Sequence, residues 1–167
     1  MTETIRIPDD IQQQLDNYQR FGIPAEFDSY SRDLYVQAGK DSEITSLSVT
    51  EPVGRALLRS KALPSDVSVM LWNPTLQGQA ARLIFLCGPP PAVDFTAGLL
   101  PVHTVCGSKV HVAFGGRLGL PTAGDDRRVW ASGPGPRTKF PDLLQLIARA
   151  KKVDTRRSKR AEGGGDP

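Results

Sequence analysis

The sequence has few of the residues from which an enzyme or a secreted protein is usually identified. Its 167 residues include only two cysteines and two histidines. Two cysteines, Cys87 and Cys106, are too few for a disulfide framework. The N-terminal MTETIRIPDD also lacks the apolar core of a secretory signal. We therefore expect a reducing, intracellular compartment: the cytoplasm, the nucleus or both.

Long apolar runs are missing too. The longest stretches, such as LIFLC at 83–87, are far shorter than the roughly 20 residues that cross a membrane as a helix. This excludes a spanning protein but leaves attachment to the periphery of a membrane open. Glycine and proline are abundant, at 16 and 14 residues, which is typical of short elements with many turns. We expect one globular domain over 1–150.

Charge is distributed unevenly along the chain, although the net charge is only +3. Residues 1–51 hold ten acidic and four basic side chains, giving −6, and residues 52–148 hold five acidic and ten basic, giving +5. Residues 149–167 add seven basic and three acidic groups, giving +4. We favour packing of the acidic first third against the remainder, and head-to-tail association of copies is the alternative.

Periodicity predicts most of the elements. Apolar residues at helical spacing predict a helix from about Pro8 to Gly22. The segment 25–38 fits a helical face and also alternates at its end, and we favour a helix that ends at Gly39. The remaining patterns predict strands at 44–49, 67–72, 82–87 and 128–131. They also predict a hairpin at 102–114 turning at Gly107-Ser108, and helices at 50–58 and from about 138 to 152.

These elements predict an α+β fold. Its antiparallel, strand-rich core would be sandwich-like or barrel-like, with N-terminal helices and a C-terminal helix. In the predicted hairpin, His103 and His111 fall on opposite faces, so they do not share one metal or substrate. His111 shares its face with Cys106, but the closely spaced ligand pairs of a zinc site are missing. We expect no metal and no cofactor.

Residues 115–126 form a candidate ligand loop, because a strand leads into consecutive glycines in AFGGRLGLPTAG (113–124), and backbone amides there can surround an anion. Pro121 and the lack of a following helix remove a dinucleotide-binding context, and a plain glycine-rich turn is the favoured interpretation. The alternative is a small enzyme or a nucleotide- or phosphate-binding protein. Its candidate polar groups are Gly115, Gly116, Arg117, Asp125 and His111.

Two neighbouring segments, DVSVMLWNPT at 66–75 and GQAARLIFL at 78–86, resemble late strands of the trimeric dUTPase-like fold. The resemblance implies two adjacent strands and covers a short part of the chain. The sequence has no counterpart of that family's catalytic aspartate or of its serine-containing arginine motif. Its active-site chemistry is therefore not transferred to any residue here.

The C-terminal segment carries the strongest outward-facing signal. Flexible clusters of cations bind polyanions by releasing condensed counterions, and residues 151–167 are too polar to order by burial, which predicts a disordered tail. We expect a non-enzymatic, matrix-like or packaging-type protein that contacts nucleic acid or an anionic membrane surface. A homo-oligomer is the candidate assembly of its body. Proline segments PPPAV and FPDL are candidate motifs for a protein partner. The polyanion-binding residues are Arg149, Lys151, Lys152, Arg156, Arg157, Lys159 and Arg160.

Overall fold

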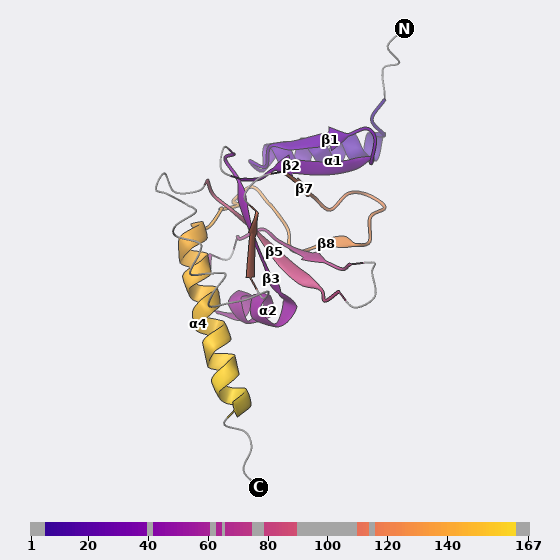
Figure 1. The fold of residues 1–167 in the computed structure, drawn as a ribbon. Helices are drawn as coiled ribbons and strands as arrows, with labels where there is room; N and C mark the ends of the chain where they lie inside the picture. The colour runs from indigo at the N-terminus through magenta and orange to yellow at the C-terminus, as the bar shows by residue number, and fades with distance from the viewer. Residues whose placement is uncertain are drawn as a thin grey trace.

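The computed structural model describes residues 6–39, 42–60, 63–64, 66–74, 79–89, 110–113 and 116–162, with the backbone alone at 113 and 156–162. Over these residues it contains three helices and two antiparallel sheets, of three and five strands. Figure 1 shows the small sheet and α1 at one end, the large sheet in the middle, and α2 and α4 on its other side. The predicted α+β fold with a strand-rich core is confirmed.

Helix α1 (Asp9–Arg20) forms where the sequence predicts it. Pro8 occupies the N-cap, acidic residues fill the first turn, and the helix stops before Gly22, whose φ of +79° suits a residue without a side chain. Its apolar stripe is buried at Ile11, Leu15 and Tyr18. The stripe faces the small sheet and fixes α1 to it.

The small sheet has the order β1-β2-β7 and corrects one prediction. Strands β1 (Ala25–Asp28) and β2 (Asp33–Gln37) form an antiparallel hairpin, so the helix expected over 25–38 is wrong. The turn is made locally, because the Asp28 carboxylate accepts the Tyr30 N–H at 2.9 Å and Arg32 adopts a left-handed φ of 59°. Such a turn ends any helix.

The third strand, β7 (Arg117–Gly119), lies inside the segment expected to be a glycine-rich loop. It pairs with β2 through Tyr35↔Gly119, Val36↔Leu118 and Gln37↔Arg117. A three-residue strand has too short a pattern to be recognised from sequence. Its partner, distant along the chain, supplies the missing backbone hydrogen bonds.

The large sheet has the order β6-β3-β5-β4-β8. Its predicted strands at 44–49, 67–72, 82–87 and 128–131 are confirmed with small shifts at their ends. Of the predicted hairpin, only 110–113 is described, and it pairs with β3, while 102–109 and 114 lie outside the described residues. The strands are β3 (Thr45–Thr50), β4 (Val69–Trp72), β5 (Arg82–Cys87), β6 (Val110–Ala113) and β8 (Arg128–Ser132).

Helix α2 (Glu51–Arg59) follows β3 directly and confirms the predicted short helix. Thr50 is its N-cap, although its side chain makes no capping hydrogen bond. Gly54 is expected to weaken the helix but has a packing role, since a Cβ there would lie 2.6 Å from Cβ of Leu83. Only glycine lets α2 approach β5 this closely.

Helix α4 (Leu143–Glu162) starts later and ends later than predicted. The Asp142 carboxylate accepts the Gln145 N–H at 2.8 Å and thereby caps the first turn. The helix runs on to Glu162, whereas we expected a disordered segment over 151–167. The physical reason is local: 143–162 contains no glycine or proline and is rich in alanine, lysine and arginine, which favour helix. Partly buried Val153 also packs against the core.

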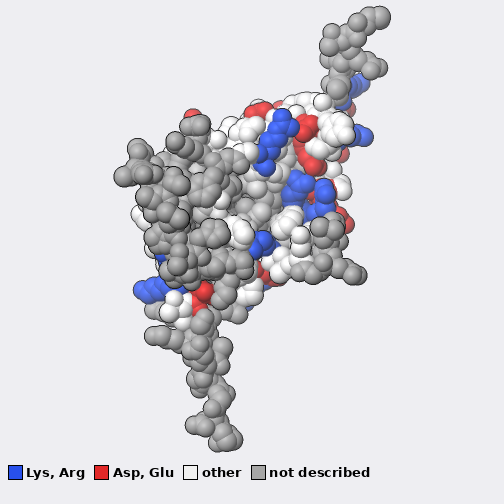
Figure 2. Space-filling view, in the orientation of Figure 1, with Lys and Arg blue, Asp and Glu red and all other residues white. Residues whose placement is uncertain are grey.

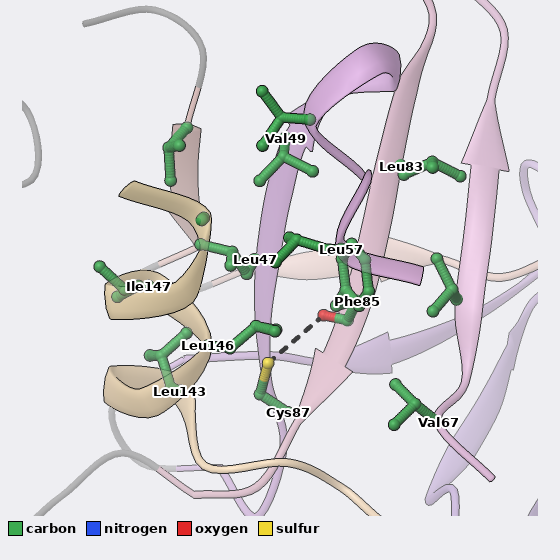
Figure 3. Close-up of a cluster of buried hydrophobic side chains, with 14 residues drawn as sticks. Leu47, Val49, Leu57, Val67, Leu83, Phe85, Cys87, Leu143, Leu146 and Ile147 are labelled. Atoms are coloured by element: carbon green, nitrogen blue, oxygen red, sulfur yellow. Dashed lines mark hydrogen bonds between the residues drawn. The ribbon is translucent and has the colours of Figure 1, made fainter. Parts of the chain in front are cut away.

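Two hydrophobic cores lie on opposite faces of the large sheet. The first, between that sheet and helices α2 and α4, holds side chains such as Leu47, Leu57, Phe85 and Leu146 (Figure 3). The second joins α1 and the small sheet to the other face through Leu86 and Trp130, among other residues. The large sheet is thus the shared wall of both cores, but the second core covers only part of its face.

Candidate functional site

The basic residues at the C-terminus belong to α4 rather than to a free tail. The first half of the helix is anchored, because Leu143, Leu146, Ile147 and Ala150 are all buried in the first core. The cations begin at Arg149 and continue along the second half, which Figure 1 shows running past α2. The backbone positions of all seven polyanion-binding residues predicted from sequence therefore lie within α4.

Helical spacing arranges these positions in a way that a flexible tail does not. Positions 149, 152, 156 and 160 are three or four residues apart, so they fall along one face of the helix. The described side chains agree with an outward placement, since Lys152 is exposed and Arg149 and Lys151 are half-buried. One acidic residue, Asp154, interrupts the cations before Glu162. The result is a basic edge on α4.

The predicted ligand loop does not assemble into one site. Arg117 lies over the ring of Tyr35, with its guanidinium carbon 4.4 Å from the ring centre, and its Nη1 is 2.8 Å from Asp28 Oδ2. Gly116 is exposed with φ +103°, which suits a turn, and Gly115 lies outside the described residues. These contacts fix β7 to the hairpin and make Arg117 a structural residue.

Asp125, another candidate of that loop, is an ion-pair centre. Its side chain is 7% exposed and lies 2.8 Å from both Arg127 Nε and Arg128 Nε. Burial acts to raise the pKa of Asp125, but the hydrogen bonds from Arg127 and the charge of both guanidinium groups outweigh burial and lower that pKa. The carboxylate is therefore ionised and compensated by the two arginines.

His111 lies elsewhere, on β6, where it is exposed and directly opposite Ser48 of β3. Residues that face each other in an antiparallel pair share one face of the sheet. His111 therefore lies on the face that α2 and α4 do not cover. The relation of His111 to His103 and Cys106, predicted from the hairpin, lies outside the described residues.

A groove of about 420 Å³ opens on that face, beside the small sheet. Its floor is formed by the large sheet, with Ser48 of β3, Ile84 of β5, and Met70 and Trp72 of β4. Apolar and aromatic surface thus dominates the floor. A cavity of this size falls within the range of small-molecule sites.

The wall of the groove comes from the small sheet and from the start of β8. Leu118 and Gly119 of β7 form one side, and Arg127 and Arg128 form the other. Gly119 has a close-approach role, because a Cβ there would clash with Nη1 of Arg128. Arg128 also lies 3.2 Å from Asp33 Oδ2, so it ties β8 to β2 across the groove.

Arg82 adds a cation beside the floor. Its Nε donates to Ser48 Oγ at 2.7 Å and its Nη2 donates to the Ser48 carbonyl at 3.1 Å. Burial lowers the pKa of the Arg82 guanidinium, although arginine stays charged at ordinary pH. Sequence reasoning missed Arg82, Trp72 and the groove itself, because these residues stand on separate strands and only the strand register brings them together.

Acidic and basic regions of the chain meet in the fold. Asp28 and Asp33 belong to the acidic first third, and they pair with Arg117 and Arg128 of the basic middle region. Figure 2 shows acidic and basic side chains intermixed over the end that carries α1 and the small sheet. At these two pairs, acidic and basic regions of the same chain neutralise each other. This favours packing of the acidic first third against the remainder over head-to-tail association of copies.

The described residues give no geometry for metal or thiol chemistry. Among them, no three His, Cys, Asp or Glu side chains gather as metal ligands would. Cys87 is buried beside Phe85 in the first core, and burial raises the pKa of its thiol to about 12, so it is a core residue (Figure 3). No helix in the described ranges combines the length and apolar character that crossing a membrane requires.

Comparisons with known proteins return nothing: no family model matches the chain, and neither a curated protein nor a solved structure does. The two segments that resemble the dUTPase-like fold contribute β4 and β5, which pair antiparallel. None of the comparisons supports a relation to that family.

Proposed function

We propose that this chain is a non-enzymatic, packaging-type or matrix-like structural protein that binds nucleic acid through the basic edge of α4. The observation that supports it best is the continuity of α4, whose buried first half fixes the orientation of its cationic second half. Cations carried on a helical backbone meet phosphates with less loss of backbone conformational entropy than cations on a flexible tail do. Phosphate contacts from such a row supply affinity without sequence specificity.

Nucleic acid is favoured over a lipid surface by the use of the helix's apolar face. A helix that lies in a membrane interface buries its apolar side among acyl chains. The apolar side of α4, with Leu146 and Ile147, is already buried against the large sheet. Only its cations remain for a membrane, whereas nucleic acid needs nothing more than cations.

Contacts with other proteins belong to the same proposal, and fewer observations support them. FPDL at 140–143 is used within the fold, since the Pro141 carbonyl accepts the Gly88 N–H at 3.1 Å and Leu143 is buried. PPPAV begins at Pro89 and lies largely outside the described residues. Self-association of the body and a partner at PPPAV stay predictions from sequence.

The test replaces charge without removing the helix. Lys152, Arg156, Lys159 and Arg160 are changed together to glutamine, which keeps helix propensity. The matched control changes four exposed arginines elsewhere, Arg6, Arg20, Arg55 and Arg59, to glutamine and removes the same total charge. Binding of a labelled single-stranded RNA and of a DNA duplex is measured by fluorescence anisotropy across salt concentrations.

We expect the α4 variant to bind at least about tenfold more weakly and to lose roughly three units of slope in log K against log salt. The control should keep most of that slope. Equal losses in both variants would place the contact in the general charge of the molecule and overturn the proposal. Binding to vesicles rich in anionic lipid, without binding to either nucleic acid, would overturn nucleic acid as the partner.

A further inference from the structure

From the groove between the two sheets we infer a second binding site, one for a phosphorylated nucleoside, either free or as one unit of a strand. The site lies on the face of the large sheet that the small sheet partly covers, whereas α4 covers the opposite face with the first core. The inference therefore does not depend on the basic edge of α4. It stands on three features of the groove: a fixed wall, an available cation and an aromatic floor.

Arg128 fixes the wall. Its side chain is only 14% exposed, its Nε lies 2.8 Å from Asp125 Oδ2, and its Nη2 lies 3.2 Å from Asp33 Oδ2. The guanidinium group occupies the space that a side chain at Gly119 would fill. Two carboxylates neutralise this arginine and hold it in place, so its role is to shape the groove.

Arg127 supplies the available cation. Its side chain is 45% exposed, and its described ion pair uses Nε, 2.8 Å from Asp125 Oδ1. The backbone N–H of Arg127 donates to the same carboxylate oxygen at 3.0 Å. The backbone and the Nε of Arg127 are thus both held by Asp125, which restricts the orientation of the side chain. The terminal Nη groups of a guanidinium form a fork that matches two oxygens of a phosphate. Arg127 thus presents an oriented fork at the rim of the groove.

Trp72 and its neighbours fit the other half of the ligand. Trp72 is half-buried in the floor, beside buried Met70 and opposite Arg82 in the strand register. A base stacks on a tryptophan face regardless of its identity. Ser48 adds a hydroxyl next to Ile84, where a sugar or a base edge would find a polar partner. A ligand with one flat ring and one phosphate satisfies the floor and the rim together.

Trp72 provides a direct readout, because the chain has only two tryptophans. In a Trp130→Phe variant, the fluorescence of Trp72 alone is followed while AMP or UMP is added, and calorimetry on the unmodified protein checks the affinity. We expect quenching with a Kd below about 1 mM. Arg127→Gln should weaken binding at least about tenfold, whereas the exposed Arg55→Gln control should leave it unchanged. Gly119→Ala, which displaces Arg128, should also weaken it.

Further titrations distinguish a free nucleotide from a nucleic acid strand and define the results that would overturn the site. A short oligonucleotide that quenches Trp72 more strongly than the monophosphates identifies a strand as the natural ligand, and the converse identifies free nucleotide. Inorganic phosphate that binds as tightly as AMP would overturn the nucleoside part. No quenching and no heat up to about 10 mM nucleotide, or equal losses in Arg127→Gln and Arg55→Gln, would overturn the site. Repeating the titration on the α4 glutamine variant keeps this result independent of the proposed function.

Discussion

The two cores on either face of the large sheet differ in the chemistry of their side chains. The core beneath α2 and α4 is made of aliphatic residues together with Phe85 and Cys87. The core beneath α1 adds hydroxyl, amide and indole groups, centred on Tyr18. Apolar packing is non-directional, whereas buried polar groups require partners in defined places. The arrangement of the first core is therefore set by how well its side chains fill the space. That of the second core is also set by the orientation of its hydrogen bonds.

Tyr18 shows how direction is imposed in the second core. Its hydroxyl donates to the Pro121 carbonyl at 2.6 Å and accepts from Trp130 Nε1 at 2.9 Å, and the two rings meet edge to face at 5.9 Å. One side chain of α1 thereby holds two segments more than 100 residues away in the chain. We call the hydrogen-bonded group of Tyr18, Gln14, Trp130 and the Pro121 carbonyl the polar hub. Polar contacts of this hub, together with apolar packing, therefore hold α1 and the small sheet against the large sheet.

Phe85→Ala should give the largest effect, because it removes the largest side chain that is fully buried in the first core. We expect the free energy of unfolding to fall by about 3–5 kcal/mol, measured by urea denaturation. Leu144→Ala is the control on α4, since Leu144 is 41% exposed, and it should cost little. A loss below about 1 kcal/mol for Phe85→Ala would show that the first core is not specified by volume.

Gly54→Ala tests the same core by overfilling it. The added Cβ would lie 2.6 Å from Leu83 Cβ, so α2 must shift away from β5. We expect destabilisation of about 1–3 kcal/mol despite the better helix propensity of alanine. Gly135→Ala is the matched control, because nothing lies within 4 Å of a Cβ there. A Gly54 variant as stable as the control would mean that the approach of α2 to β5 is not tight.

Tyr18→Phe keeps the ring and removes the hub. We expect a loss of about 1–3 kcal/mol at neutral pH, because the indole N–H of Trp130 is left without its acceptor. Tyr30→Phe is the control, since Tyr30 is 98% exposed at the tip of the β1–β2 hairpin. Equal stability of the two variants would remove the distinction between the cores.

The same pair of variants predicts a dependence on alkaline pH. Burial raises the pKa of Tyr18, with hydrogen bonds from Trp130 and Gln14 acting in the opposite direction. A pKa raised by folding stabilises the protein below the ordinary tyrosine value and ceases to do so as pH rises through the folded value. The unmodified protein should therefore lose more stability above about pH 10 than Tyr18→Phe does. Parallel curves would contradict this.

Gln14→Ala should give the smallest effect, at the edge of the hub. The Gln14 amide donates to the Pro121 carbonyl at 3.0 Å, and its oxygen accepts the Ala123 N–H at 2.9 Å. These bonds lie near solvent, where water replaces them, so we expect a loss of about 0.5–1 kcal/mol in thermal or urea unfolding. Gln13→Ala on the exposed side of α1 is the reference. A loss as large as that of Tyr18→Phe would move the centre of the hub to Gln14.

The hairpin at 25–37 shows where sequence reasoning fails. Phe27, Tyr30 and Leu34 have helical spacing, yet two of them lie in strands and Tyr30 lies in the turn. The pattern is too short to separate the two periods. Pairing of β2 with β7 and burial of Leu34 in the second core decide the matter, and both depend on residues far along the chain.

The two candidate sites also differ in how much of them the sequence predicts. The cations of α4 can be recognised in the sequence as a basic cluster, but their alignment requires the helix. Its continuation past 152 is not indicated by apolar content, because that segment has little. The glycine-rich segment does draw attention to Gly119 and Arg127 by proximity. It does not lead to the groove, however, because Arg117 contacts Asp28 and Tyr35 instead. Trp72 and Arg82 stand on strands that local patterns cannot align.

The sequence alone determined α1, α2, β4, β5 and the amphipathic first half of α4. Each of these has a local period, with proline or glycine at an end, and a local period needs no distant partner. Only the tertiary structure decided β1, β2 and β7, the shared wall of the two cores and the groove. Those features form when backbone groups and side chains from distant segments meet, and their free energy depends on that meeting rather than on the local chain.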